Sequence, residues 1–134
     1  MTFRYLLDTN AVSDVARSPT GSVVRRLADE AGTCAINTIV LAVLRFGVLS
    51  RGSTRLADRV ENIVSRLVTL PFGAPAANHY ADIRLSLTRS GRPIGANDLL
   101  IAAHARSLDL TVVTANVLEF ARVPDLAVED WSTV

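Results

Sequence analysis

The chain has 134 residues, 49% of them hydrophobic, and its 14 basic and 13 acidic side chains give a net charge of +1. This composition suits a single folded domain over residues 1–134, and it excludes a disordered chain and a surface that is basic as a whole. All the basic residues are arginines, which excludes P-loop nucleotide binding and Schiff-base chemistry because both need a lysine.

The hydrophobic pattern predicts short apolar strands that alternate with helices. In chain order we expect a strand at 3–7, helices at 11–16 and 22–31, a strand at 33–36, helices at 39–49 and 56–67, a strand at 68–72, helices at 74–90 and 99–108, a strand at 110–113, a helical turn at 117–120 and an edge strand at 126–129. This alternation is typical of an α/β protein with a parallel sheet covered by helices on both faces.

The chain shows no export or membrane segment. The apolar stretch at its N-terminus is too short for a signal peptide and ends at Asp8. No apolar run reaches the roughly 18 residues that a membrane-spanning helix needs. We therefore expect a cytoplasmic protein.

Three polar clusters lie where a parallel sheet gathers its functional residues, at the carboxyl ends of strands. They are Asp8-Thr9-Asn10 after the first strand, Thr114-Ala115-Asn116 after the fourth, and Asn97-Asp98, which opens a helix after a Gly/Pro loop and is another possible strand end. Two aspartates that converge would repel each other unless a cation lay between them. Mg²⁺ suits such a pair, because it prefers oxygen ligands and needs only one or two carboxylates.

Each of these residues also has a local interpretation. Asp8 could form an Asx-turn, Asn116 could form a turn, and Asp98 could simply favour the start of its helix. None of them indicates a nuclease by itself.

Longer segments of the sequence resemble VapC toxins of the PIN-domain family. They are LLDTN at residues 6–10, PIGANDLLIAAHA at 93–105, VVTANVLEF at 112–120, RVP at 122–124 and VEDW at 128–131. Together they follow the family's order over nearly the whole chain. The resemblance implies a PIN-like three-layer α/β/α fold with a short, mostly parallel central sheet.

The same resemblance implies an endoribonuclease that uses Mg²⁺ or Mn²⁺ in a pocket of four acids, and RNA, possibly tRNA, as its substrate. Asp8 and Asp98 correspond to acids that bind the metal, Asn116 to the fourth position of the pocket, and Glu119 to an additional acid. The polar residues that would support them are Thr9, Asn10 and Thr114. As partners, the family implies a second copy of the chain and a VapB-like antitoxin, through which the complex binds operator DNA.

The chain departs from the family at Val43, where relatives carry the pocket's second acid, a glutamate. Valine can neither bind a cation nor accept a proton. Val43 is either an inactivating change, introduced or selected because an active toxin kills its host, or a feature of a divergent toxin that acts through Asp8, Asp98 and Glu119. We favour inactivation, and thus a folded protein with weak or no activity. The alternative function is a binding partner for the antitoxin within a regulatory complex.

Two surfaces are candidates for contacts with these partners. Arg84, Arg89 and Arg92 lie around the loop before Asp98, and Arg84 and Arg92 in particular could bind RNA phosphate or antitoxin carboxylates, although a solvated helix face is the simpler explanation. A groove for an amphipathic antitoxin helix could be lined by five apolar residues, unless these are ordinary core: Phe46, Val48, Leu49, Val60 and Ile63.

Other reactive side chains carry weaker signals. The single cysteine, Cys34, excludes an internal disulfide, and we expect it to be buried. His79 and His104 lack a metal-ligand spacing, and His104 is expected in the core. A receiver domain also has strands that end in aspartates, but it relies on a lysine that this chain lacks.

Overall fold

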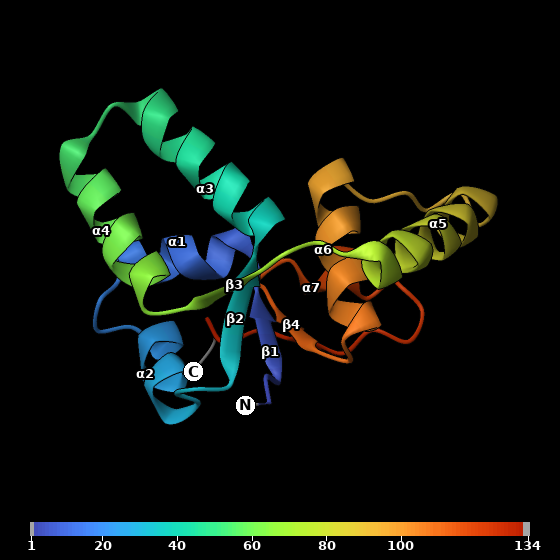
Figure 1. Cartoon of the computed structure of the whole chain (residues 1–134), viewed down its shortest axis with the longest axis horizontal. Helices are drawn as coiled ribbons and strands as arrows, with labels where there is room; N and C mark the ends of the chain where they lie inside the picture. The colour runs from blue at the N-terminus through green and yellow to red at the C-terminus, as the bar shows by residue number, and fades with distance from the viewer. Residues whose placement is uncertain (1, 133–134) are drawn as a thin grey trace.

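The computed structural model describes residues 2–132, which form five short parallel strands and seven helices. The elements are β1 (Tyr5–Leu7), α1 (Thr9–Arg17), α2 (Ser22–Asp29), β2 (Cys34–Asn37), α3 (Thr38–Arg51), α4 (Thr54–Ser65), β3 (Val68–Leu70), α5 (Ala74–Arg89), α6 (Ala96–Ser107), β4 (Thr111–Val113), α7 (Val117–Phe120) and β5 (Val128–Glu129). Figure 1 shows how they are arranged around the central sheet.

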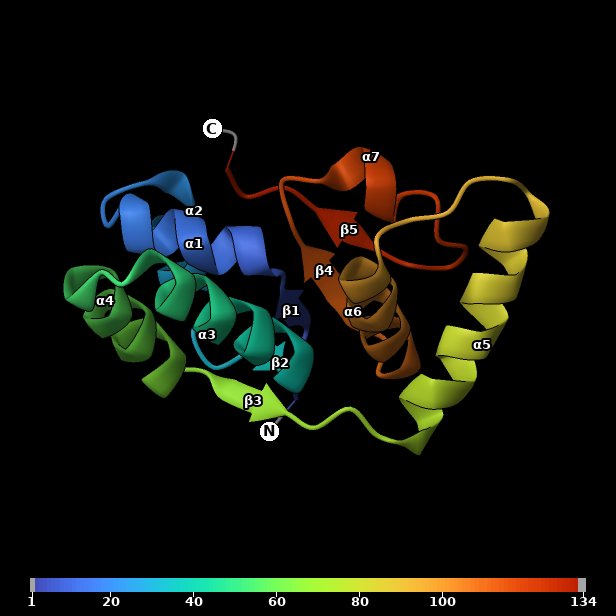
Figure 2. The ribbon, with the colours of Figure 1, turned by 90° about the horizontal axis from the view of Figure 1, so that it is seen from above.

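Helices cover both faces of this sheet, as expected from the apolar strands. Figure 2 shows α1 to α4 on one side of the strands and α5 and α6 on the other. Side chains of the central strands, among them Leu6, Leu7, Ile36 and Val112, are fully buried. Strands that are buried on both faces are apolar throughout, which explains why they carry no alternating pattern. The predicted α/β fold class is confirmed.

The strand order places β1 at the position where the sheet changes its winding direction. The order is β3-β2-β1-β4-β5, and every neighbouring pair is parallel. The chain builds outward from β1 to β2 and β3 and then crosses back to β4 and β5. The carboxyl ends of β1 and β4 therefore flank a crevice at a topological switch point, where α/β sheets bind ligands.

The structure corrects two predictions at this edge. Helix α1 begins at Thr9, two residues before the predicted helix at 11–16, so Thr9 and Asn10 are helical, and Asp8 is the N-cap whose carboxylate accepts a hydrogen bond from the Thr9 N–H. The cluster Asn97-Asp98 does not follow a strand, since α6 begins at Ala96 directly after a loop that leaves α5. The remaining differences are strand and helix ends displaced by one to three residues, which short-range patterns define poorly.

Two side chains expected in the core are there. His104 is buried, its Nδ1 lies 3.1 Å from Asn37 Nδ2, and burial lowers its pKa. Cys34 is buried as well, and burial raises the pKa of its thiol to about 11. Within residues 2–132, no helix has the length and apolar character needed to cross a membrane.

Candidate active site

A pocket of about 520 Å³ opens at the carboxyl ends of β1 and β4, where α1, α3 and α6 approach one another. Both predicted metal ligands, Asp8 and Asp98, line it, together with Asn10, Asn116 and Val43. Residues that are 90 positions apart in sequence thus face one cavity. The central prediction from the sequence, two carboxylates at one edge of the sheet, agrees with this geometry.

Asp8 is held rigidly at the floor of the pocket, with only 4% of its surface exposed. Its Oδ1 accepts a hydrogen bond from the Thr9 N–H at 2.7 Å, and its Oδ2 accepts bonds from Thr114 Oγ1 at 2.9 Å and Asn10 Nδ2 at 3.1 Å. Burial raises the pKa of Asp8 despite these hydrogen bonds, and the charge of Glu119 raises it further. The carboxylate is therefore fixed in place yet costly to keep charged without a cation.

Thr114 and Asn10 form the connection between the two strand ends. Asn10 Nδ2 donates to Thr114 Oγ1 at 3.0 Å, and Asn10 Oδ1 accepts from the Ala115 N–H at 3.0 Å. The hydroxyl of Thr114 also accepts from the Asn116 N–H at 3.0 Å. The structure thus brings all three predicted supporting residues to Asp8, but Thr9 contributes only its backbone.

Asp98 lies in the first turn of α6 and faces Asp8 across the pocket. Its pKa is raised to about 7, first by burial and next by the negative charge of Asp8. A hydrogen bond with Glu119 adds to the shift by favouring the protonated form. Asp98 is therefore the group in which the repulsion between the two carboxylates appears most clearly.

Glu119 is not among the residues that line the pocket, but it lies next to Asp98, and its charge raises the pKa of both Asp8 and Asp98. Its Oε1 accepts from the Gly95 N–H at 2.7 Å and its Oε2 accepts from Asn116 Nδ2 at 2.6 Å. The bond from Gly95 is also the main reason why the pKa of Glu119 is lowered. Glu119 thus holds the start of α6 and the side chain of Asn116 in position, and it also contacts the carboxyl group of Asp98. Its role as an additional acid of the pocket stays a prediction.

Val43 projects from α3 into the pocket wall, half-buried. Position 43 therefore shares the cavity with Asp8 and Asp98, as expected if it replaces a pocket acid. The consequence for activity stays a prediction.

Two polar side chains of this pocket were missed in the sequence. Ser13 and Arg17 line it from α1, three and seven positions after Asn10. This spacing marks one face of a helix, and the polar stripe was a detectable signal. By contrast, Arg84 and Arg92 do not line the pocket, and the guanidinium of Arg84 donates to the Tyr80 hydroxyl at 2.8 Å. Their predicted contacts with RNA or antitoxin remain predictions.

The donor set fits a small divalent cation. The pocket offers carboxylate, amide and hydroxyl oxygens, the ligands that Mg²⁺ prefers. A carboxylate has about four acceptor sites, and the hydrogen bonds to Asp8 use one on Oδ1 and two on Oδ2, which leaves one on Oδ1. Within residues 2–132, no group of three or more His, Cys, Asp or Glu side chains is arranged to hold a metal. Asp8 and Asp98 are the carboxylates that line this pocket, and Mg²⁺ needs only one or two.

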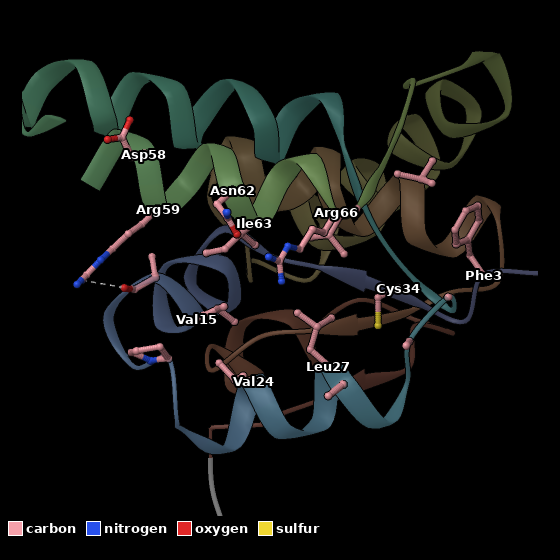
Figure 3. A pocket seen from close by; sticks show the side chains of 17 residues that line it. Phe3, Val15, Val24, Leu27, Cys34, Asp58, Arg59, Asn62, Ile63 and Arg66 are labelled. Atoms are coloured by element: carbon pink, nitrogen blue, oxygen red, sulfur yellow. Dashed lines mark hydrogen bonds between the residues drawn. The ribbon is translucent and has the colours of Figure 1, made fainter. Parts of the chain in front are cut away.

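A second cavity of about 810 Å³ lies away from the acids and is mainly apolar. Figure 3 shows Val15 from α1, Val24 and Leu27 from α2, and Ile63 from α4 around it. We call this cavity the apolar groove. It differs from the predicted groove, because Val60 is buried in the core whereas Phe46 and Leu49 are exposed on α3. Only Ile63 belongs to both, so the predicted composition was wrong.

Comparison with known proteins agrees with this geometry. The profile of the PIN domain family matches residues 5–126. The tRNA(fMet)-specific endonuclease VapC of Shigella flexneri is 39% identical over 96% of this chain and 98% of its own length. Ribonuclease VapC2 of Haemophilus influenzae is 36% identical over 96% and 98%.

Solved structures show the same likeness. The structure of VapBC2 from Rickettsia felis bound to a DNA fragment from its promoter superposes with a TM-score of 0.89, at 35% identity over 96% of this chain and 99% of that one. The DNA-bound VapBC of Salmonella typhimurium gives 0.88, at 34% identity over 97% and 99%.

Proposed function

Since this chain belongs to the PIN-domain family and is of the VapC toxin type, we propose that it is a metal-dependent endoribonuclease of a type II toxin–antitoxin pair. The observation that carries the proposal is the placement of Asp8 and Asp98 in one pocket at the switch point of the sheet. The substrate would be a structured RNA such as a tRNA, in line with the name of the Shigella relative. Cleavage would inhibit translation. Because translation takes place in the cytoplasm, the protein would act there.

In this proposal Asp8 and Asp98 hold Mg²⁺ or Mn²⁺. The bound ion would supply a Lewis acid that activates water and offsets negative charge on the phosphate. Thr114 and Asn10 both donate hydrogen bonds to Oδ2 of Asp8 and so fix the orientation of the carboxylate. The remaining acceptor site, on Oδ1, would then be the one that binds the ion. Asn116 lies at the pocket wall, where its position is fixed through Glu119. Loss of such supporting contacts typically costs 10–100-fold in metal affinity or activity.

The direct test is cleavage of a purified tRNA in Mg²⁺, with and without a chelator. Because Val43 is expected to weaken activity, we expect slow cleavage that disappears with the chelator and in the variants Asp8→Asn and Asp98→Asn. Cleavage that persists in Asp98→Asn or in the chelator would come from another site or a contaminant, and would refute the proposal.

Val43 favours a second candidate function, a weakly active or inactive toxin that mainly binds its antitoxin. With Val43, the pocket is lined by the carboxylates of Asp8 and Asp98 and lacks the glutamate that relatives carry at position 43. Calorimetry distinguishes the two: an inactive partner binds antitoxin but no Mg²⁺, whereas the enzyme binds both.

We also propose that a VapB-like antitoxin is the partner, with its apolar segment in the apolar groove. The groove has the mixed character of a peptide site, since its wall is apolar and its rim carries Asp58, Arg59 and Arg66. Operator DNA would be bound through the antitoxin alone. Leu27→Arg should prevent co-purification with the antitoxin, whereas Leu118→Arg, at a residue 85% exposed outside the groove, should not. Equal binding by both variants would place the antitoxin elsewhere.

The assembly would be a homodimer, in which each chain acts as a single PIN-like domain over residues 1–134. Phe46 and Leu49 of α3 are 72% and 81% exposed. Large apolar side chains that neighbour each other on one helix are suited to an interface between copies.

A further inference from the structure

One polar face of α1 runs along the wall of the acidic pocket and ends at the positively charged side chain of Arg17. Asn10, Ser13 and Arg17 line the pocket from this face, while Val12 and Ala16 on the opposite face are buried in the core. Among the described residues that line the pocket, Arg17 is the one basic side chain. The last turn of α1 thus places one positive side chain at a pocket whose other charged side chains are the acids Asp8 and Asp98.

The guanidinium of Arg17 is available to a ligand. The side chain is exposed, and no carboxylate of residues 2–132 lies within ion-pair distance of it. The carbonyl of Ala16 next to it, at the end of α1, is already bonded by Arg59 Nη1 at 3.3 Å, which Figure 3 shows as a dashed line. Because Arg17 has no ion pair among residues 2–132, an anion that binds it breaks no existing one.

We propose that Arg17 binds a phosphate of the RNA beside the one that is cut, an inference that rests on the proposed ribonuclease function. A polyanion that enters a pocket with two aspartates needs a compensating cation, and arginine binds phosphate oxygens with a two-pronged fork. Nine residues of helix separate Arg17 from Asp8, roughly 13 Å along the axis. A helical side chain leans back toward the N-terminus and shortens this separation, but not enough to reach the acids. Arg17 therefore meets a neighbouring phosphate and not the reacting one.

This role predicts an effect on RNA binding that is separate from the chemical step. A charge-assisted hydrogen bond at an exposed site corresponds to about tenfold in affinity. Each phosphate contact also steepens the fall of log affinity with log salt, by about 0.7 for a single strand and about 0.9 for a duplex. Lysine keeps the positive charge but cannot donate two parallel hydrogen bonds to one phosphate. Arg17→Lys should therefore keep the salt dependence of RNA binding and lose only part of the affinity.

The test measures binding of a fluorescently labelled RNA hairpin by anisotropy in chelator, so that no cleavage occurs, over a series of salt concentrations. The variants are Arg17→Ala, Arg17→Lys and the matched control Arg55→Ala, an exposed arginine on α4 that lines neither cavity. We expect about tenfold weaker binding and a shallower slope for Arg17→Ala, and no change for Arg55→Ala. Thermal unfolding checks that each variant is folded.

Two results would overturn the inference. If Arg17→Ala binds like the unsubstituted chain, or if Arg55→Ala loses as much affinity, Arg17 has no specific contact while the ribonuclease proposal stands. If the unsubstituted chain binds no RNA in chelator and cleaves none in Mg²⁺, the ribonuclease proposal itself fails. In the Val43→Glu background, Arg17→Ala should raise KM and leave kcat nearly unchanged.

Discussion

Substituting Val43 with glutamate would place a third carboxylate in a pocket that already holds Asp8 and Asp98. The side chain projects from α3 into the pocket wall and is half-buried, so the longer glutamate can extend into the cavity instead of the core. We expect two opposite effects, depending on whether a cation is present.

With a divalent cation, Val43→Glu should strengthen metal binding. Removing a residue that only orients a ligand costs about 10–100-fold in affinity or activity, so adding a direct ligand should gain at least that much. A gain of this size corresponds to about 1.4–2.7 kcal/mol. Without the cation, the new charge meets two like charges. The pKa of Asp98, already raised to about 7, should rise further, and the metal-free protein should lose stability.

The assay pairs calorimetric titration with Mg²⁺ or Mn²⁺ and thermal unfolding in chelator. Val43→Gln is the control, because it matches glutamate in size but adds no charge. Val43→Glu should bind the cation at least tenfold more tightly than either the unsubstituted chain or Val43→Gln, and should unfold at a lower temperature in chelator. RNA cleavage in Mg²⁺ should rise with metal affinity.

Equal metal affinity in the three proteins would refute the reasoning, because position 43 would then not face the cation. An increase in Val43→Gln as large as in Val43→Glu would show that charge is not the cause. Higher metal affinity with unchanged cleavage would show that Val43 does not limit the chemical step.

Three further predictions concern the charges and contacts of the site. The raised pKa of Asp98, about 7 against an ordinary 3.8, means that the folded metal-free state binds the proton more tightly than the unfolded state. Its stability should fall as pH rises from about 4 to 7, and unfolding of Asp98→Asn should lack this part of the pH dependence. Thr114→Val removes the 2.9 Å bond to Asp8 Oδ2 and should weaken metal binding by about tenfold in calorimetry, unlike Thr111→Val at the start of β4, the strand that Thr114 follows. Phe46→Asp should convert a dimer into a monomer in light scattering, and a dimer that persists would exclude α3 from the interface.

Much of the fold could be predicted from the sequence because its signals are local. Short apolar runs alternate with helical spacing, and this pattern indicated a parallel sheet between helices. The segment PIGANDLLIAAHA indicated the family and assigned Asp98. These features depend only on neighbouring residues and on the order of motifs along the chain, so a single sequence contains them.

Other properties of the site arise only between distant residues. Nothing near Asp8 in sequence indicates that Thr114 donates to its Oδ2, because this contact depends on β4 lying beside β1. Glu119 accepts a hydrogen bond from the loop before α6, a contact that a motif match cannot reveal. The predicted groove failed for the same reason, since Val60 packs inward once α4 lies on α1 and α3.

The order of residue types along the chain determined the fold class, the family and which carboxylates matter. Only the tertiary structure decided that Ser13 and Arg17 line the same pocket as the acids, and that Glu119 binds the Gly95 N–H at the start of α6. The physical reason is that side-chain spacing along a helix or strand is set locally, whereas the distance between two elements depends on how the whole sheet and its helices pack.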